Sequence, residues 1–194
     1  KLCNENAVVF FPDGNENLSR TTHLAISAHH DDIELMAMHG VLECFGKKDK
    51  WFTGVVVTDG AGSPRNGLYA DYTDEEMKAV RVVEQKKAAF VGEYAAQLML
   101  GYTSAAVKDG KNDKVVEDLM RVIEETRPEI IYTHNPADKH DTHCAVVLRV
   151  IEAIRRLPKE LRPKKLYGCE VWRDLDWVVD EEKTVFDVSA HPNV

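Results

Sequence analysis

Two short clusters of histidines and carboxylates contain the side chains best suited to chemistry. Residues 29–32 read His-His-Asp-Asp, and residues 138–143 read Asp-Lys-His-Asp-Thr-His. Two imidazole nitrogens and one carboxylate oxygen, with water in the fourth position, form a known catalytic zinc arrangement. Neither cluster supplies enough ligands alone, and taken singly each is more often a solvated turn or a surface coincidence. A metal site is therefore expected only if the fold brings the two clusters together.

Each cluster follows a short apolar segment that is typical of a buried strand, at residues 23–28 and 129–134. Apolar spacing and turn residues predict the remaining elements. Further strands are expected at residues 51–58, 97–102, 164–172 and 183–189. Helices are expected at residues 33–45, from a cap at Thr73 to residue 91, at 114–126 and at 145–157.

Strands that alternate with helices of about a dozen residues indicate repeated strand-helix-strand units. We predict an α/β fold, a Rossmann-like three-layer sandwich with a mostly parallel sheet. Such sheets carry their sites at the carboxyl ends of strands, near the point where the strand order reverses. If the order reverses in the common way, strands 23–28 and 129–134 are neighbours, and their two polar clusters meet.

At these residues the sequence resembles the LmbE-like or PIG-L-type N-acetylglucosaminyl deacetylases. Their signature is Ala-His-Pro-Asp-Asp followed by a later His-x-x-His. Here residues 28–32 read Ala-His-His-Asp-Asp, and residues 140–143 read His-Asp-Thr-His. Residues 58–60, 81–84 and 171–174 also look like the family, so the resemblance spans roughly residues 24–187.

The resemblance implies a hydrolase that removes an N-acetyl group from an N-acetylglucosamine-type sugar or its conjugate. It implies one zinc ion per chain, bound by His29, Asp32 and His143. Iron(II) or cobalt(II) would suit the same ligands, since availability decides among divalent metals. By the same resemblance, Asp31 is the general base and His140 either polarises the carbonyl or protonates the leaving amine.

Arg81 resembles a family arginine near the active site. We consider it a substrate-binding residue, with a surface ion pair to Glu84 as the alternative. Trp172 and Trp177 could form a wall for a sugar ring, although aromatics at this spacing more often fill a core or an oligomer surface.

The sequence departs from the family pattern at three places. His30 replaces the usual proline; we expect its ring to point away from the metal and leave a ligand role open. Asp141 and Thr142 replace the common Pro-Asp, so either Asp138 or Asp141 could orient the ring of His140. The sequence stops at residue 194, before the C-terminal helix of many family members, and we expect it to be truncated there.

Composition limits the other function classes. The length of 194 residues fits one domain over residues 1–194. There are 25 Lys and Arg against 33 Asp and Glu, for a net charge of −8, so non-specific nucleic-acid binding is not expected. No apolar run approaches the roughly 20 residues of a membrane span. The four separated cysteines form no Cys-x-x-Cys pair, which predicts free thiols in a reducing cytoplasm.

Two other functions stay open. One is an amidase that acts on another N-acyl conjugate, which would share every ligand and differ only in the loops. The other is a non-catalytic metal-binding protein, which would need neither Asp31 nor His140. In each case the partner is a small molecule or a metal, and homo-oligomerisation stays undecided.

Overall fold

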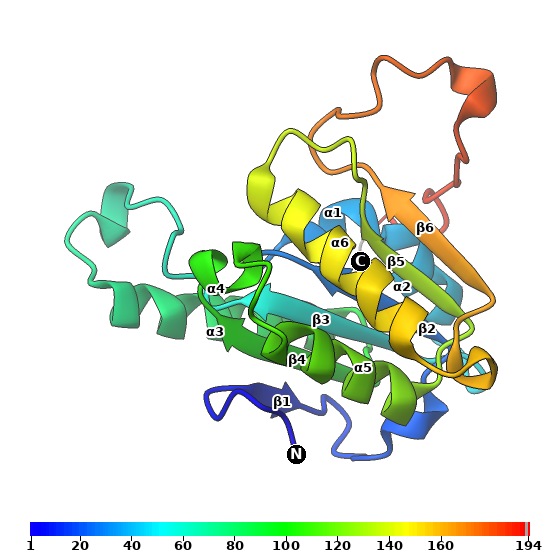
Figure 1. Ribbon diagram of the computed structural model, residues 1–194, viewed down its shortest axis with the longest axis horizontal. Coiled ribbons are helices and arrows are strands. Elements are labelled where there is room, and N and C mark those ends of the chain that lie inside the picture. The colour runs from blue at the N-terminus through cyan, green and yellow to red at the C-terminus, as the bar shows by residue number, and fades with distance from the viewer. Residues whose placement is uncertain (193) are drawn as a thin grey trace.

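A computed structural model describes residues 1–192 and residue 194, and its centre is a six-stranded sheet (Figure 1). The strand order is β1-β4-β3-β2-β5-β6. Only β1 is antiparallel to its neighbour, and the other pairs are parallel. The strands are β1 (Val8–Phe10), β2 (His23–Ser27), β3 (Phe52–Thr58), β4 (Ala96–Tyr102), β5 (Ile130–His134) and β6 (Lys165–Cys169).

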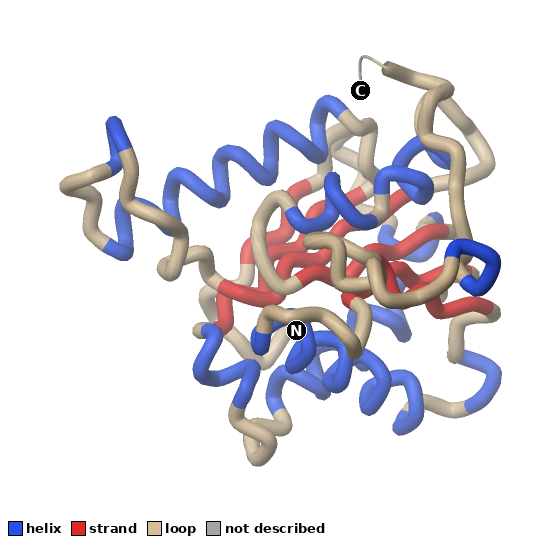
Figure 2. The backbone as a smooth tube through the Cα atoms, turned by 90° about the horizontal axis from the view of Figure 1, so that it is seen from above, coloured by secondary structure: helices blue, strands red, loops and turns tan. Residues whose placement is uncertain are grey.

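Six α-helices cover the two faces of the sheet (Figure 2). They are α1 (Asp32–Met36), α2 (Met38–Cys44), α3 (Asp74–Val91), α4 (Ser104–Lys108), α5 (Lys114–Thr126) and α6 (Asp141–Arg156). Successive strand residues point to opposite faces. In β2, Leu24 and Ile26 belong to the core beneath α4, α5 and α6, whereas Ala25 belongs to the core beneath α1, α2 and α3. The predicted α/β fold with three layers and a mostly parallel sheet is therefore confirmed.

The switch in strand order determines where the site lies. Strand β2 pairs in parallel with both β3 and β5, and Ile26 of β2 lies opposite Thr133 of β5. The prediction that β2 and β5 are neighbours is therefore confirmed. Because parallel strands end at the same edge of the sheet, the loops after β2 and β5 emerge side by side.

Several predicted elements differ from the structure. The single helix expected at 33–45 is divided at Ala37, whose backbone (φ −117°, ψ 17°) leaves the helical region. The strand expected at 164–172 ends at Cys169, and no strand forms at 183–189. Instead of pairing in a ladder, Phe186 stacks on His39 with ring centroids 3.8 Å apart. The edge strand β1 and the short helix α4 were not predicted.

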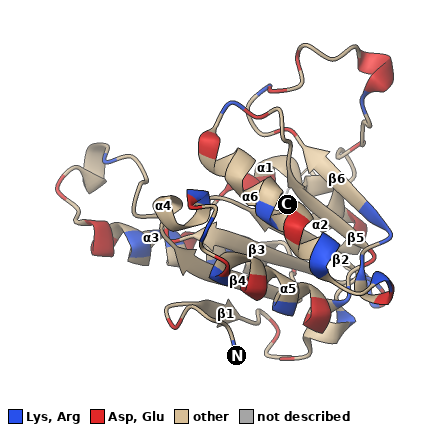
Figure 3. Ribbon diagram, in the orientation of Figure 1, with Lys and Arg blue, Asp and Glu red and all other residues tan. Residues whose placement is uncertain are grey.

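Charged residues of both signs are interspersed along the helices and loops (Figure 3). Within the part of the chain that the structure describes, no helix combines the length and apolar character that crossing a membrane requires.

Candidate metal centre

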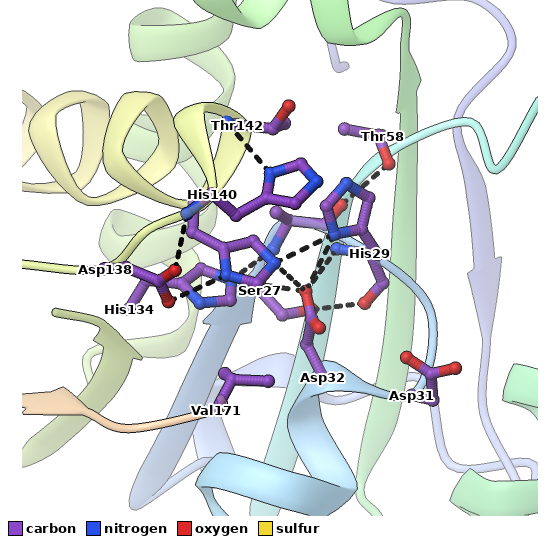
Figure 4. A network of polar contacts seen from close by, with 12 residues as sticks. Ser27, His29, Asp31, Asp32, Thr58, His134, Asp138, His140, Thr142 and Val171 are labelled. Carbon is purple, nitrogen blue, oxygen red and sulfur yellow. Dashed lines mark hydrogen bonds and ion pairs between the residues drawn. The ribbon is translucent and has the colours of Figure 1, made fainter. Parts of the chain in front are cut away.

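Three side chains converge at the carboxyl ends of β2 and β5 (Figure 4). His29 Nδ1 lies 3.0 Å from His143 Nε2 and 3.2 Å from Asp32 Oδ2. His143 Nε2 lies 3.3 Å from the same Asp32 oxygen. Ligands about 2.0–2.1 Å from a tetrahedral zinc ion lie about 3.3 Å from one another. The structure thus brings together the three residues expected as metal ligands, at a spacing that suits one small ion.

Local structure fixes these three side chains. Strand β2 ends at Ser27, and α1 begins at Asp32, whose Oδ2 accepts a hydrogen bond of 2.7 Å from the His29 N–H. Helix α6 begins at Asp141, four residues earlier than predicted, so His143 lies in its first turn. Its N-cap is His140, whose Nδ1 accepts from the Thr142 N–H at 3.2 Å.

Asp138 orients His143. The His143 Nδ1 lies 2.8 Å from Asp138 Oδ2, and both side chains are buried. Because a carboxylate accepts, His143 carries its proton on Nδ1 and presents the Nε2 lone pair to Asp32 and His29. A metal-binding histidine commonly donates its other N–H to a carboxylate in this way. The sequence suggested Asp138 only as a partner of His140, so this contact was missed.

The donor set fits a cation. Asp32 and Asp138 are both buried, and within the described residues their ion-pair partners are histidines rather than Lys or Arg. Two buried carboxylates without a cation are unfavourable. A divalent ion between His29, Asp32 and His143 would neutralise this charge.

His134, at the end of β5, belongs to the supporting contacts. Its Nε2 accepts a 2.8 Å hydrogen bond from the Ala28 N–H and lies 3.3 Å from Asp32 Oδ2. Burial lowers its pKa, so the ring is neutral. Since the Nε2 lone pair is already taken, His134 serves as a structural acceptor between β5 and the loop after β2.

His140 stands beside the three convergent side chains. Its ring centroid lies 4.8 Å from that of His29 and 4.6 Å from that of His143. Because Nδ1 accepts from a backbone N–H, the neutral ring carries its proton on Nε2, which points toward His29 (Figure 4). Burial lowers the pKa of His140, which favours that neutral form. Neither carboxylate considered from the sequence orients this ring, because Asp141 lies 3.6 Å from Nδ1 and the Asp138 side chain contacts the His143 ring instead. The hydrogen bond from the backbone of α6 orients it.

Asp31 and Arg81 form an ion pair at the rim of the site. Arg81 donates from Nη2 to Asp31 Oδ2 at 2.8 Å and to the His30 carbonyl at 2.6 Å. Its Nη1 donates to Glu84 at 2.6 Å. The ion pair with Glu84, considered as the alternative from sequence, is present, and the guanidinium also holds Asp31. The Asp31 carboxylate lies to one side of the convergent side chains (Figure 4).

A cavity of about 590 Å³ opens over the site. It is lined by His29, Asp31, Asp32, Arg81, His140 and Trp172, among other residues. Its size is in the usual range for a small-molecule site, about 300–1,000 Å³. The exposed Trp172 lies edge-on to His140, with centroids 5.4 Å apart. Trp177 does not line this cavity within the described part of the chain.

His30, which stands where the family has proline, is 1% exposed. Its ring lies next to Gly60 and Arg81, and neither ring nitrogen has a hydrogen-bond partner among the described residues. Burial and the neighbouring Arg81 lower its pKa to about 4, so the ring is neutral. Two groups of side chains among the described residues, His29 with His140 and His143, and Asp32 with His134 and His143, have ligand atoms close enough to share an ion, and neither includes His30.

Comparison with known proteins identifies the family. A family model described as GlcNAc-PI de-N-acetylase, PIG-L, matches residues 24–154. The chain belongs to the PIG-L family. The match begins at the second residue of β2 and includes both histidine clusters, α3 and strands β3, β4 and β5. No curated protein sequence matches the chain significantly.

Solved structures share the fold of this PIG-L chain. N,N'-diacetylchitobiose deacetylase from Pyrococcus horikoshii is 16% identical, with a TM-score of 0.63 over 84% of this chain and 66% of that one. The conserved protein TT1542 from Thermus thermophilus is 18% identical, with a TM-score of 0.59. The match covers 77% of this chain and 66% of that one. The 4-carboxy-2-hydroxymuconate hydratase GalB from Pseudomonas putida is 18% identical, with a TM-score of 0.54. The match covers 76% of this chain and 62% of that one.

These similarities establish the fold and no more. The chain covers less than two thirds of the length of each of the three structures. One of them is described as a deacetylase and another as a hydratase, so the scaffold alone does not determine the reaction. The reaction has to be argued from the side chains in the cavity.

Proposed function

We propose that the chain is a metal-dependent hydrolase that removes the N-acetyl group from an N-acetylglucosamine-type sugar or its conjugate. One observation carries the proposal. The atoms His29 Nδ1, Asp32 Oδ2 and His143 Nε2 lie 3.0–3.3 Å apart, and His29 and Asp32 line a cavity that Asp31 and His140 also line. A site that only held a metal would need neither of the last two residues.

His29, Asp32 and His143 would hold the ion, with zinc as the first choice for two nitrogens and one oxygen. When bound, such an ion supplies an acidified water and a Lewis acid for the amide carbonyl. Asp138 keeps the His143 lone pair directed at the site through its 2.8 Å contact with Nδ1.

Asp31 would take the proton of the attacking water. Its carboxylate is exposed to the cavity, unlike that of Asp32, so it can receive a proton and pass it on. A positioned carboxylate of this kind typically contributes about 10²–10⁴-fold to the rate. In this arrangement Arg81 orients Asp31, and contact with the substrate is a secondary role for the guanidinium.

His140 would donate from Nε2 to the carbonyl oxygen as negative charge develops there. The hydrogen bond from Thr142 to Nδ1 fixes the tautomer that this role requires. Protonation of the leaving amine by His140 would need a doubly protonated ring, which its lowered pKa disfavours. The proton that Asp31 accepts can reach the amine instead. Of the two roles considered for His140, the tautomer supports the oxyanion donor.

Two further observations support an N-acyl sugar as substrate. The matching family is described as a GlcNAc-PI de-N-acetylase, and one similar structure is an N,N'-diacetylchitobiose deacetylase. In addition, the exposed ring of Trp172 forms a wall of the cavity on which a sugar can pack. The four free cysteines support a reducing compartment, and we propose the cytoplasm.

The test is release of free amine from N-acetylglucosamine and a panel of its small conjugates. Metal-depleted protein is assayed with and without zinc, iron(II) or cobalt(II), and the bound metal is measured in parallel. We expect no release without metal and restored release after addition of one equivalent. If the protein binds one metal ion per chain but releases amine from no N-acyl sugar, the proposal is wrong. Larger N-acyl conjugates then test the amidase alternative.

A further inference from the structure

The backbone of Asp31 has a conformation that a non-glycine residue rarely adopts. Its φ of 79° and ψ of −23° lie in the left-handed region, directly before α1. Such a conformation persists only where surrounding contacts impose it, and it often occurs at functional sites. The contacts that impose it at Asp31 come from α3, about 50 positions away in the sequence.

Two residues of α3 hold Asp31 from different sides. Arg81 binds its carboxylate and the preceding carbonyl, at 2.8 and 2.6 Å. Gln85, one helical turn later, accepts a hydrogen bond from the Asp31 N–H with Oε1 at 3.2 Å. The arginine therefore holds the side chain, and the glutamine holds the backbone.

Gln85 is 2% exposed, and its amide is oriented by its own partners. Its Nε2 donates to Glu34 Oε1 at 3.0 Å and to Gln97 Oε1 at 3.3 Å. The Tyr94 hydroxyl donates to the same Glu34 oxygen at 2.8 Å. Since both acceptors lie on the Nε2 side, the amide cannot turn over without losing them, and Oε1 remains directed at Asp31.

We infer that Gln85 is a positioning residue for the general base Asp31. It acts through a hydrogen bond to the Asp31 backbone, which holds the carboxylate at the cavity rim. This inference rests on the proposed function for the role of Asp31, whereas the structural effect on Asp31 does not depend on activity. Nothing in the sequence pattern marked Gln85, because its contact with the loop after β2 exists only in the folded chain.

The test compares Gln85→Met with Thr126→Val. Both replacements remove a buried hydrogen-bonding group, but the Thr126 hydroxyl donates to the Val122 carbonyl within α5 and contacts neither Asp31 nor Gln85 among the described residues. The melting temperature and the metal content of both variants are measured first, so that the two are compared at similar stability and metal loading. The readouts are hydrogen exchange of the Asp31 amide, followed by NMR, and kcat and KM for amine release.

We expect Gln85→Met to expose the Asp31 amide to exchange and to lower kcat about 10 to 100-fold, with KM within about twofold and metal content unchanged. Thr126→Val should keep both the exchange protection and kcat. Unchanged protection in Gln85→Met, or equal loss of kcat in the two variants, would overturn the inference. If the wild type releases no amine, the proposed function fails, and the exchange measurement still decides whether Gln85 holds Asp31.

Discussion

Asp31 and Asp32 are adjacent residues of the same type in opposite environments. The Asp32 side chain is 3% exposed and surrounded by histidines, whereas that of Asp31 is 65% exposed and faces Arg81. The left-handed backbone at Asp31 separates the two carboxylates. One can therefore bind an ion while its neighbour exchanges protons with the cavity.

Replacing the proposed general base and a proposed metal ligand should have different effects on metal binding and on turnover. We expect Asp31→Asn to retain one metal per chain and to lose about 10²–10⁴-fold in kcat. His143→Ala should lose both metal and turnover, because it removes a proposed ligand. Metal analysis and steady-state kinetics on the same samples measure this. An Asp31→Asn variant with normal kcat would remove Asp31 from its proposed role.

Asp138 should affect metal affinity although it is not a proposed metal ligand. Asp138→Asn weakens the contact that fixes the His143 tautomer, so we expect metal affinity to fall about 10 to 100-fold. Competition with a chelator measures the affinity. Asp141→Asn is the matched control, since that carboxylate is exposed and pairs with Lys108 at 2.8 Å. Equal affinities in the two variants would contradict the orienting role of Asp138.

At the scale of elements, the site depends on how closely α2 packs on the sheet beneath it. Gly40 of α2 leaves no room for a side chain: an added Cβ would lie 2.6 Å from Tyr132 and 3.0 Å from Phe52. This close approach lets α1 and α2 cover β2 and β5 directly after the metal-binding loop.

We expect Gly40→Ala to destabilise the fold by roughly 1–3 kcal/mol, because the methyl group overpacks two aromatic rings of the core. Thermal unfolding with Gly110→Ala as the control checks this, since nothing lies within 4 Å of a Cβ at Gly110. A Gly40→Ala variant with the melting temperature of the control would show that α2 can shift away without cost.

At the scale of the whole molecule, local apolar patterns predicted the elements that the site needs. The apolar runs that end at residues 28 and 134 gave β2 and β5, and strand-helix alternation gave their neighbouring positions. The three-residue strand β1 pairs with β4, a contact far along the chain that no local pattern shows. The segment 183–189 is rich in the Val, Phe and Thr residues that strands favour, but Phe186 packs on His39 and Tyr167.

The site was predictable in its residue types and less so in its contacts. His29, Asp32 and His143 were expected together and lie together. Sequence spacing could not reveal three features that depend on the folded geometry. They are the contact between His143 and Asp138, the tautomer of His140, and the hydrogen bonds from α3 to Asp31. The extent of the domain over residues 1–194 and the roles of the site residues stay predictions.

The most direct test of the central claim is a crystal structure of zinc-loaded protein, with anomalous scattering measured at the zinc edge. We expect one ion per chain, about 2.0–2.2 Å from His29 Nδ1, Asp32 Oδ2 and His143 Nε2. Absence of an ion from these three atoms at saturating zinc, or an ion held by His134 or His30 in their place, would contradict the proposed metal centre.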